Sequence, residues 1–254
     1  MNETQPPELV SVDWPVPANV RTLQTTRKGG FSLAPYDSLN LGDHVGDDAL
    51  TVTRNRQSLN DILPSEPVWL EQVHGVEVVV AEQTSCKPRA DACISCTKNA
   101  VCIAMTADCL PVLLCDQAGT VVAAAHAGWR GLADGVLEST VRAMNVAPSN
   151  LMAWLGPAIG PQAFEVGDDV RDAFISHDPK ASAAFTPSPQ RGEGGGDGVK
   201  YLADIYQLAR QRLNALGATQ IYGGGLCTYT DSERFFSFRR DGATGRMASL
   251  IWLA

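Results

Sequence analysis

The feature that most constrains the fold is a set of three apolar runs in the middle of the chain, each as long as one β-strand. They are rich in valine and leucine and lie at Ala100–Thr106, Pro111–Cys115 and Thr120–Ala125. Continuous apolar runs are typical of strands that are buried on both faces. The sequence therefore predicts an α/β fold, of the mixed α+β kind, in which mixed β-sheets are covered by helices.

Periodicity and turn signals predict the remaining elements. Further strands are expected at Val20–Thr26, Val68–Val73, Val76–Ala81, Leu151–Leu155, Phe235–Arg239 and Met247–Leu253. Helices are expected from Asp47 or Asp48 to about Leu63, and at Gly131–Met144, Gly167–Ser176 and Ala203–Leu216, the last ended by Gly217. Because the two kinds of element alternate without a linker, we expect one catalytic domain over 1–254, with a flexible Gly/Pro-rich surface loop at 187–198.

Charge and cysteine usage exclude several classes of protein. The formal net charge is −8 and no dense basic block is present, which argues against general nucleic-acid binding. No signal peptide is visible, and the longest apolar stretch, Val101–Cys115, is interrupted by Asp108 and Pro111 and is too short to span a bilayer. Seven cysteines without secretion features indicate reduced thiols. We therefore expect a cytoplasmic protein that binds small molecules, without nucleic-acid, membrane or obligate protein partners.

Two of the four histidines lie in unusual surroundings. His74 ends a predicted strand in GluGlnValHisGly, and His126 lies where an apolar strand gives way to AlaGlyTrpArgGly. Between them, ThrAlaAspCysLeuProVal places Cys109 at a break between two apolar runs. Catalytic zinc commonly takes three ligands from His, Cys and carboxylates and keeps one position open. The three residues are therefore a candidate zinc site, although two core histidines and a buried cysteine would give the same pattern.

A rival metal set contains the only Cys-x-x-Cys of the chain, formed by Cys93 and Cys96. With His74 upstream it loosely imitates the zinc nucleobase deaminases, which use His-x-Glu followed by Pro-Cys-x-x-Cys. Here Glu77 falls three residues after the histidine, and Ala92 replaces the proline. Both departures affect functional parts of that pattern, so the rival is disfavoured.

Five motifs together resemble one known family: GluGlnValHisGly, ThrAlaAspCysLeuProValLeuLeu, AlaAlaHisAlaGlyTrpArgGly, GlyProAlaIleGly and PheSerPheArgArgAspGlyAlaThrGlyArg. The family has been described as laccase-like polyphenol oxidase, purine nucleoside phosphorylase and peptidoglycan editing factor, and the resemblance runs from about Ser38 to Leu253. It implies a single α/β domain, a zinc site at His74, Cys109 and His126, phosphorolysis of adenosine, inosine and methylthioadenosine, and some adenosine deamination. Cys86, Cys93 and Cys96 lie outside these motifs.

A zinc site of this kind needs supporting residues. Zinc lowers the pKa of bound water, and Asp108 beside Cys109 is a candidate proton shuttle or anchor, or a hydrogen-bonded turn residue. Phosphate requires cationic or N–H donors, for which the candidates are Arg56, Arg130, Arg240 and Arg246. Asn40 is a candidate for orienting a substrate hydroxyl or for stabilising its own loop.

Three other functions stay open. Cys109 and His126 would also suit a cysteine hydrolase that cleaves an amide of a peptidoglycan precursor. A multicopper oxidase needs more histidine ligands than the four present, but a single copper at the three-ligand site is possible because Cu(II) outcompetes Zn(II) at most such sites. A structural metal module is disfavoured, because structural sites usually have four ligands.

Overall fold

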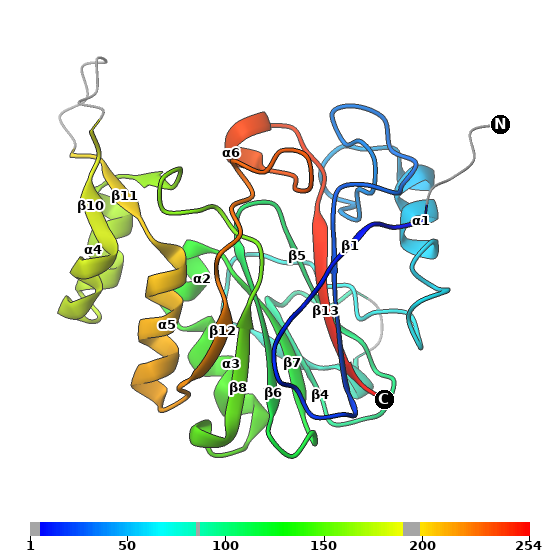
Figure 1. The fold of residues 1–254 in the computed structure, drawn as a ribbon, viewed down its shortest axis with the longest axis horizontal. Coiled ribbons are helices and arrows are strands. Elements are labelled where there is room, and N and C mark those ends of the chain that lie inside the picture. Colours follow the sequence, from blue (N-terminus) through cyan, green and yellow to red (C-terminus); the bar gives the residue numbers. More distant parts are fainter. Residues whose placement is uncertain (1–5, 85–86, 190–198) are drawn as a thin grey trace.

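The computed structural model describes residues 6–84, 87–189 and 199–254. Most of the loop predicted at 187–198, and Cys86, lie outside these residues. In the described part, thirteen strands form three sheets that are accompanied by helices, which confirms the predicted mixed α/β class (Figure 1). The assignment of 1–254 to one domain stays a prediction.

The largest sheet contains the predicted apolar runs. Its strand order is β12 (Gln220–Gly223), β8 (Leu151–Leu155), β6 (Leu110–Asp116), β7 (Val122–Ala127), β4 (Ala92–Ser95) and β3 (Val78–Val80). The pairs β12–β8 and β3–β4 are parallel, and the other pairs are antiparallel. The sheet is therefore mixed, as predicted.

The second sheet packs against one face of the first. It is antiparallel, in the order β1 (Leu9–Val10), β2 (Val20–Thr25), β13 (Met247–Leu253) and β5 (Cys102–Thr106). A small third sheet has the order β10 (Phe185–Pro187), β11 (Tyr201–Ala203) and β9 (Glu165–Val166). The helices are α1 (Ala49–Gln57), α2 (Trp129–Asp134), α3 (Val136–Met144), α4 (Asp168–Ile175), α5 (Ile205–Leu216) and α6 (Phe238–Asp241), with 3-10 turns at Ala81–Gln83, Pro148–Asn150 and Pro179–Ala184.

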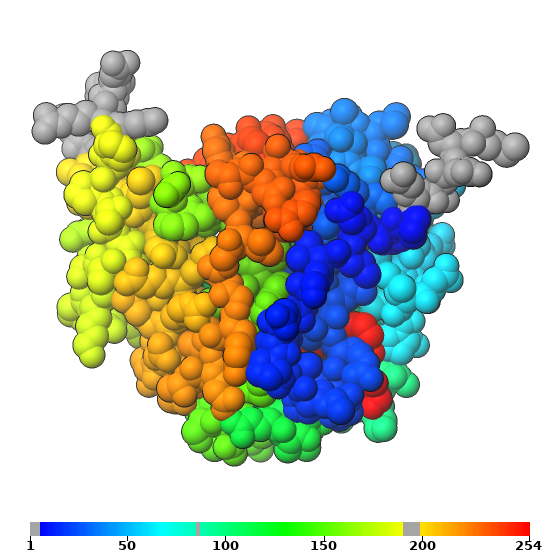
Figure 2. Space-filling view, viewed as in Figure 1, coloured from blue at the N-terminus to red at the C-terminus, as the bar shows by residue number. Residues whose placement is uncertain are grey.

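Strand β6 shows why the apolar runs are continuous. Val112 and Leu114 belong to the core shared with helices α3 and α5, whereas Leu113 and Cys115 belong to the core shared with the second sheet. Successive side chains of a strand point to opposite faces, so both sets must be apolar when both faces are covered. In the space-filling view the N-terminal segment (blue) and the segment that follows β12 (orange) both reach the surface, with parts of the central strands (green) visible between them (Figure 2).

Several predicted elements match closely. Strands β8 and β13 have the predicted bounds, and α5 ends at Gly217, whose φ of 94° is left-handed. Helix α1 begins after Asp48, which accepts a hydrogen bond from the Thr51 N–H, but ends at Gln57, before the predicted Leu63. Strands β4 and β12 and the short strands β1, β9, β10 and β11 were not predicted.

Three predicted elements are wrong. The segment Val68–Val73 is not a strand, because its N–H groups bond partly to other loops and to the Asp91 carboxylate. The helix predicted over Gly131–Met144 is divided into α2 and α3 by Gly135, whose φ is 101°. The strand predicted over Phe235–Arg239 is a turn followed by α6, because the Ser237 side chain accepts a hydrogen bond from the Arg240 N–H and caps a helix there.

Within the described ranges, every helix is too short or too polar to cross a bilayer.

Candidate metal centre

The structure brings His74, Cys109 and His126 together. His74 lies in the loop before β3 and has a left-handed φ of 62°. Cys109 directly precedes β6, and His126 lies in β7, which pairs with β6. Their ligand atoms all lie within 4.8 Å of one another, and His74 Nε2 is 3.7 Å from Cys109 Sγ. Bond lengths of about 2.3 Å for Zn–S and about 2.0–2.1 Å for Zn–N place two ligands of a tetrahedral ion about 3.6 Å apart. The donor set therefore fits a metal ion.

Asp91 holds two of these ligands in place. It is fully buried, and its carboxylate accepts hydrogen bonds from the N–H groups of Val73 (3.2 Å), His74 (2.9 Å) and Gly75 (2.7 Å). Asp91 Oδ1 also lies 2.8 Å from Nδ1 of His126. When Nδ1 carries the proton of this hydrogen bond, Nε2 of His126 is free to bind a metal, as in the carboxylate–histidine–zinc arrangement.

Charge interactions shift the pKa values of Cys109 and His126 in opposite directions. Burial by itself raises the pKa of the Cys109 thiol, but the charge of His126 and hydrogen bonds with both histidines outweigh it and lower the pKa to about 6. Burial by itself lowers the pKa of His126, but the charge of Cys109 and the hydrogen bond with Asp91 raise it to about 9. Both shifts favour a thiolate on Cys109, the form that binds metal, and a proton on the His126 ring.

Gly128 leaves room for the ligands. A Cβ atom at this position would lie 2.7 Å from His74 Cδ2 and 3.0 Å from Cys109 Sγ. Gly128, the first glycine of the HisAlaGlyTrpArgGly motif, is thus required because the β7–α2 turn passes close to the metal ligands.

The rival Cys-x-x-Cys set is not assembled. Cys93 is fully buried in β4, whereas Cys96 is exposed after the end of that strand. Among the described residues, the His74–Cys109–His126 group is the one cluster of three His, Cys, Asp or Glu side chains close enough to share an ion.

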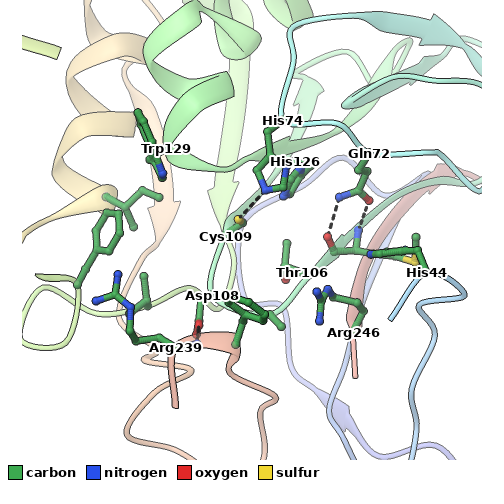
Figure 3. A pocket seen from close by; sticks show the side chains of 16 residues that line it. His44, Gln72, His74, Thr106, Asp108, Cys109, His126, Trp129, Arg239 and Arg246 are labelled. Carbon is green, nitrogen blue, oxygen red and sulfur yellow. Dashed lines mark hydrogen bonds between the residues drawn. The ribbon is translucent and has the colours of Figure 1, made fainter. Parts of the chain in front are cut away.

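The three ligands face a cavity of about 300 Å³, which is within the size range of small-molecule sites. Its lining combines aromatic rings, two arginines and polar groups: His44, Gln72, His74, Met105, Thr106, Ala107, Asp108, Cys109, His126, Trp129, Ile159, Phe164, Ile205, Phe238, Arg239 and Arg246. In the view of Figure 3, Trp129 lies on one side of the ligands, and Arg246 and His44 lie on the other. Arginines thus line both sides of the cavity, Arg246 beside His44 and Arg239 on the side of Trp129.

Asp108 lines this cavity with both carboxylate oxygens already engaged. Oδ1 accepts a hydrogen bond from the Thr228 hydroxyl and Oδ2 from the Arg239 N–H, each at 2.6 Å. Its φ of 97° is strained for a residue with a side chain, and it places Cys109 at the start of β6. This placement favours the anchoring role among those predicted for Asp108.

Of the four arginines predicted to bind phosphate, Arg246 lines the cavity. Arg56 donates to the Leu41 carbonyl and stacks on Trp69, and Arg130 is exposed beside the Trp129 ring. The guanidinium of Arg240 donates to three backbone carbonyls and to Asp241. These three cations are therefore held away from the cavity lining by other contacts.

Asn40 lies behind the cavity wall and not in it. It is fully buried, and its side-chain oxygen accepts hydrogen bonds from the N–H groups of Gly42 and Arg246, both at 2.9 Å. Its amide donates to the Gly42 carbonyl and to Asp47. By accepting the hydrogen bond from the Arg246 N–H, Asn40 positions the backbone of Arg246.

Sequence reasoning missed several residues of the site. Asp91 had one usable signal, an acidic residue directly before an apolar stretch that contains Cys93. Arg239 was overlooked in favour of its neighbour Arg240, because a sequence cannot show which of two adjacent arginines faces a cavity. Trp129, Phe164 and Phe238 line the cavity from three separate segments, which no local pattern connects.

Comparisons with known proteins agree with the predicted family. A family model described as multi-copper polyphenol oxidoreductase laccase matches residues 21–254. An Escherichia coli (strain K12) protein named purine nucleoside phosphorylase YfiH is 58% identical over 249 residues, which cover 97% of this chain and 99% of that protein. A Pseudomonas aeruginosa protein named as a purine nucleoside phosphorylase is 56% identical over 241 residues, 95% of this chain and 96% of that protein.

Solved structures share the fold over almost the whole chain. A Neisseria meningitidis protein has a TM-score of 0.89 at 54% identity, covering 96% of this chain and 98% of that one. A Bacillus licheniformis hypothetical protein has a TM-score of 0.83 at 32% identity, covering 92% and 93%. Because these matches run nearly from end to end, the chain belongs to the laccase-like polyphenol oxidase family, in which similar curated proteins are named purine nucleoside phosphorylases.

Proposed function

We propose that the chain is a zinc-dependent purine nucleoside phosphorylase that acts on adenosine, inosine and methylthioadenosine. The observation that carries the proposal is the His74–Cys109–His126 donor set, which opens onto a cavity with aromatic and cationic lining. The names of the relatives support the same activity. The predicted cytoplasmic location and small-molecule partners, nucleoside and phosphate, belong to this proposal, since free thiols persist in reducing compartments.

When bound, zinc would supply Lewis-acid activation of an oxygen nucleophile. The protein's own residues contribute binding and orientation. Trp129, Phe164 and Phe238 offer ring faces for a purine, and Phe238 is 59% exposed although it lines the cavity, so its ring is available at the mouth. Asp91 sets the orientation of His126, and Asp108 anchors the segment that carries Cys109.

Adenosine deamination is proposed as a side activity of the same cavity. In this reaction water replaces phosphate as the nucleophile and attacks the purine carbon that bears the amino group, and the C–N bond breaks to release ammonia. Phosphorolysis instead attacks the ribose carbon that bears the base. Both reactions need an oxygen nucleophile next to a bound purine nucleoside, which one site can provide.

The test is a product assay with purified protein. Inosine cleavage should require inorganic phosphate and should yield hypoxanthine and ribose 1-phosphate in equal amounts. Chelation should abolish the reaction, and added zinc should restore it. Cleavage that proceeds without phosphate, or that survives complete metal removal, would contradict the proposal.

A second candidate rests on the thiolate–imidazolium pair of Cys109 and His126, which is also the arrangement of a cysteine hydrolase. Such an enzyme would cleave an amide of a peptidoglycan precursor without metal. Chelation therefore separates the two candidates, since the amide hydrolase keeps its activity and the phosphorylase loses it.

A third candidate follows from the family description, which names a multi-copper oxidase. The sequence has four histidines, too few for a multicopper site, but a single copper could occupy the three-ligand group. Weak oxidation of phenolic dyes is then expected only after copper loading. Several coppers per chain in protein as isolated would refute the ligand argument.

A further inference from the structure

The cavity contains a buried hydroxyl group without a partner. Thr106 is 2% exposed and lines the cavity at the end of β5. Its hydroxyl makes no hydrogen bond to any residue that the structure describes. A buried hydroxyl that lacks a partner destabilises a fold, so such a group in a ligand cavity indicates that the ligand supplies the partner.

Arg246 is the cation next to this hydroxyl. The side chains line one cavity, and Arg246 directly precedes Met247, which lies opposite Thr106 in the β5–β13 pair. In the view of Figure 3, Thr106 lies between Asp108 and Arg246. The two donors therefore line the same cavity from neighbouring segments, Thr106 at the end of β5 and Arg246 directly before β13.

The charge of Arg246 lacks an ion-pair partner within the described part of the chain. No carboxylate oxygen there lies within 4.0 Å of its guanidinium. Its Nη1 donates to the Thr244 and Gly245 carbonyls, both at 3.0 Å. No group in the described part of the chain accepts a hydrogen bond from its Nε or Nη2. A partly buried guanidinium with unused donors is suited to bind a planar or tetrahedral oxyanion.

The position of Arg246 is built into the fold. Asn40 accepts a hydrogen bond from its N–H at 2.9 Å. Gly42 packs against its side chain, where a Cβ atom would lie 2.7 Å from Cγ of Arg246. The guanidinium is thus held at the cavity by a buried amide and a close backbone contact.

We infer that Thr106 and Arg246 form a binding subsite for a tetrahedral oxyanion, inorganic phosphate, on the side of the metal ligands away from Trp129. The inference rests on the proposed phosphorylase function and deepens it. This subsite would orient the substrate, with the phosphate beside Arg246 and the purine toward Trp129 on the other side of the metal ligands. His44 lines the Arg246 side of the cavity.

The test compares Thr106→Val with Thr106→Ser. Valine keeps the branched shape that suits a strand and removes the hydroxyl, whereas serine keeps the hydroxyl. Loss of a hydrogen bond to a charged group weakens binding about tenfold or more. Thr106→Val should therefore raise the KM for phosphate about tenfold, with less than about a twofold change in the KM for inosine, and Thr106→Ser should stay close to wild type.

Thr140→Val is the control. Thr140 is also fully buried, but its hydroxyl donates to the Val136 carbonyl within α3, and it is not part of the cavity lining. This variant should leave the KM for phosphate unchanged. A rise equal to that of Thr106→Val, or an unchanged KM in Thr106→Val, would overturn the subsite.

Direct binding of inorganic phosphate, measured by calorimetry on the protein as purified, separates the two proposals. Weaker phosphate binding by Thr106→Val and normal binding by Thr106→Ser would support the subsite even if inosine were not cleaved, and only the phosphorylase proposal would then fail. Phosphorolysis with wild-type phosphate affinity in Thr106→Val would instead retain the enzyme and refute the subsite. Failure of the wild-type protein to bind phosphate would refute both.

Discussion

At the scale of single residues, the metal ligands depend on one buried acid. Asp91 accepts hydrogen bonds from three consecutive N–H groups that include His74, and it bonds the His126 ring. Burial raises the pKa of Asp91, but the hydrogen bond and charge of His126 outweigh it and lower the pKa. Asp91 is therefore a carboxylate that positions both histidines without touching the cavity.

We expect Asp91→Asn to flip the tautomer of His126. The amide can turn an N–H toward Nδ1, which would move the ring proton to Nε2 and block metal binding. Loss of such a partner typically weakens metal affinity about 10–100-fold. Competition with a zinc indicator measures the affinity, and long-range nitrogen NMR of metal-free protein well above pH 9, where the His126 ring is neutral, reports the tautomer.

Asp116→Asn is the control for that substitution. Asp116 is also buried, at 4% exposure, and accepts bonds from the Thr120 and Val121 N–H groups, but it lies at the other end of β6. The Asp116→Asn variant should have a lower free energy of unfolding but keep the zinc affinity of the wild type. Equal zinc loss in both variants would show that Asp91 acts only through folding.

The second prediction at this scale concerns the reactivity of Cys109. In metal-free protein its alkylation rate should rise with pH and be half-maximal near pH 6, because its pKa is lowered to about 6 and only the thiolate reacts. Cys96 is an exposed internal reference whose pKa is raised by burial and by the charges of Glu82 and Asp116. Peptide mass spectrometry resolves the two thiols, and a Cys109 profile centred near an ordinary thiol pKa would disprove the ion pair. Bound zinc should slow Cys109 alkylation only.

At the scale of elements, the turn from β7 into α2 brings the backbone against the ligands. Gly128 is the first residue outside α2, and a Cβ there would overlap His74 and crowd Cys109. The turn thus connects β7, which carries His126, to α2, whose first residue, Trp129, lines the cavity.

We expect Gly128→Ala to lower zinc content strongly, because its new methyl group must displace His74 or Cys109. Gly225→Ala is the matched control, since a Cβ at Gly225 meets no atom within 4 Å. Zinc per chain, measured by elemental analysis, should fall in the first variant and stay near wild type in the second. Full zinc content in Gly128→Ala would show that the ligands do not pack against this turn.

At the scale of the whole molecule, the metal ligands join three separate parts of the chain. His74 comes from the loop before β3, Cys109 from the start of β6, and His126 from β7. An ion that binds these groups only when they are assembled stabilises the folded state by mass action. A bound metal ion would therefore also act as a tertiary cross-link.

Zinc at about 100 times its dissociation constant should raise the melting temperature by about 5–10 °C. Calorimetric scans with zinc and with a chelator measure the shift. Cys109→Ala should abolish it, and Cys96→Ser should retain it, because Cys96 lies outside the cluster. A shift that persists in Cys109→Ala would mean that the ion stabilises the protein elsewhere.

The sequence by itself determined the buried strands and pointed to the candidate ligand set. Continuous apolar runs are needed wherever both faces of a strand are covered, so β5, β6 and β7 were visible without a structure. His74, Cys109 and His126 were visible because strand ends and small-residue turns aim side chains into a common space. These are local signals, and they survive in a single sequence.

Only the tertiary structure decided which supporting residues reach the cavity. Arg246 lines the cavity and Arg240 does not, because the Arg240 guanidinium donates hydrogen bonds to neighbouring backbone carbonyls and to Asp241. Asp91 and Thr106 gain their roles from groups that are far away in the chain, His126 for the carboxylate and Arg246 for the hydroxyl. Long-range hydrogen bonds and burial depend on how separate strands pack, and a local pattern carries no information about that packing.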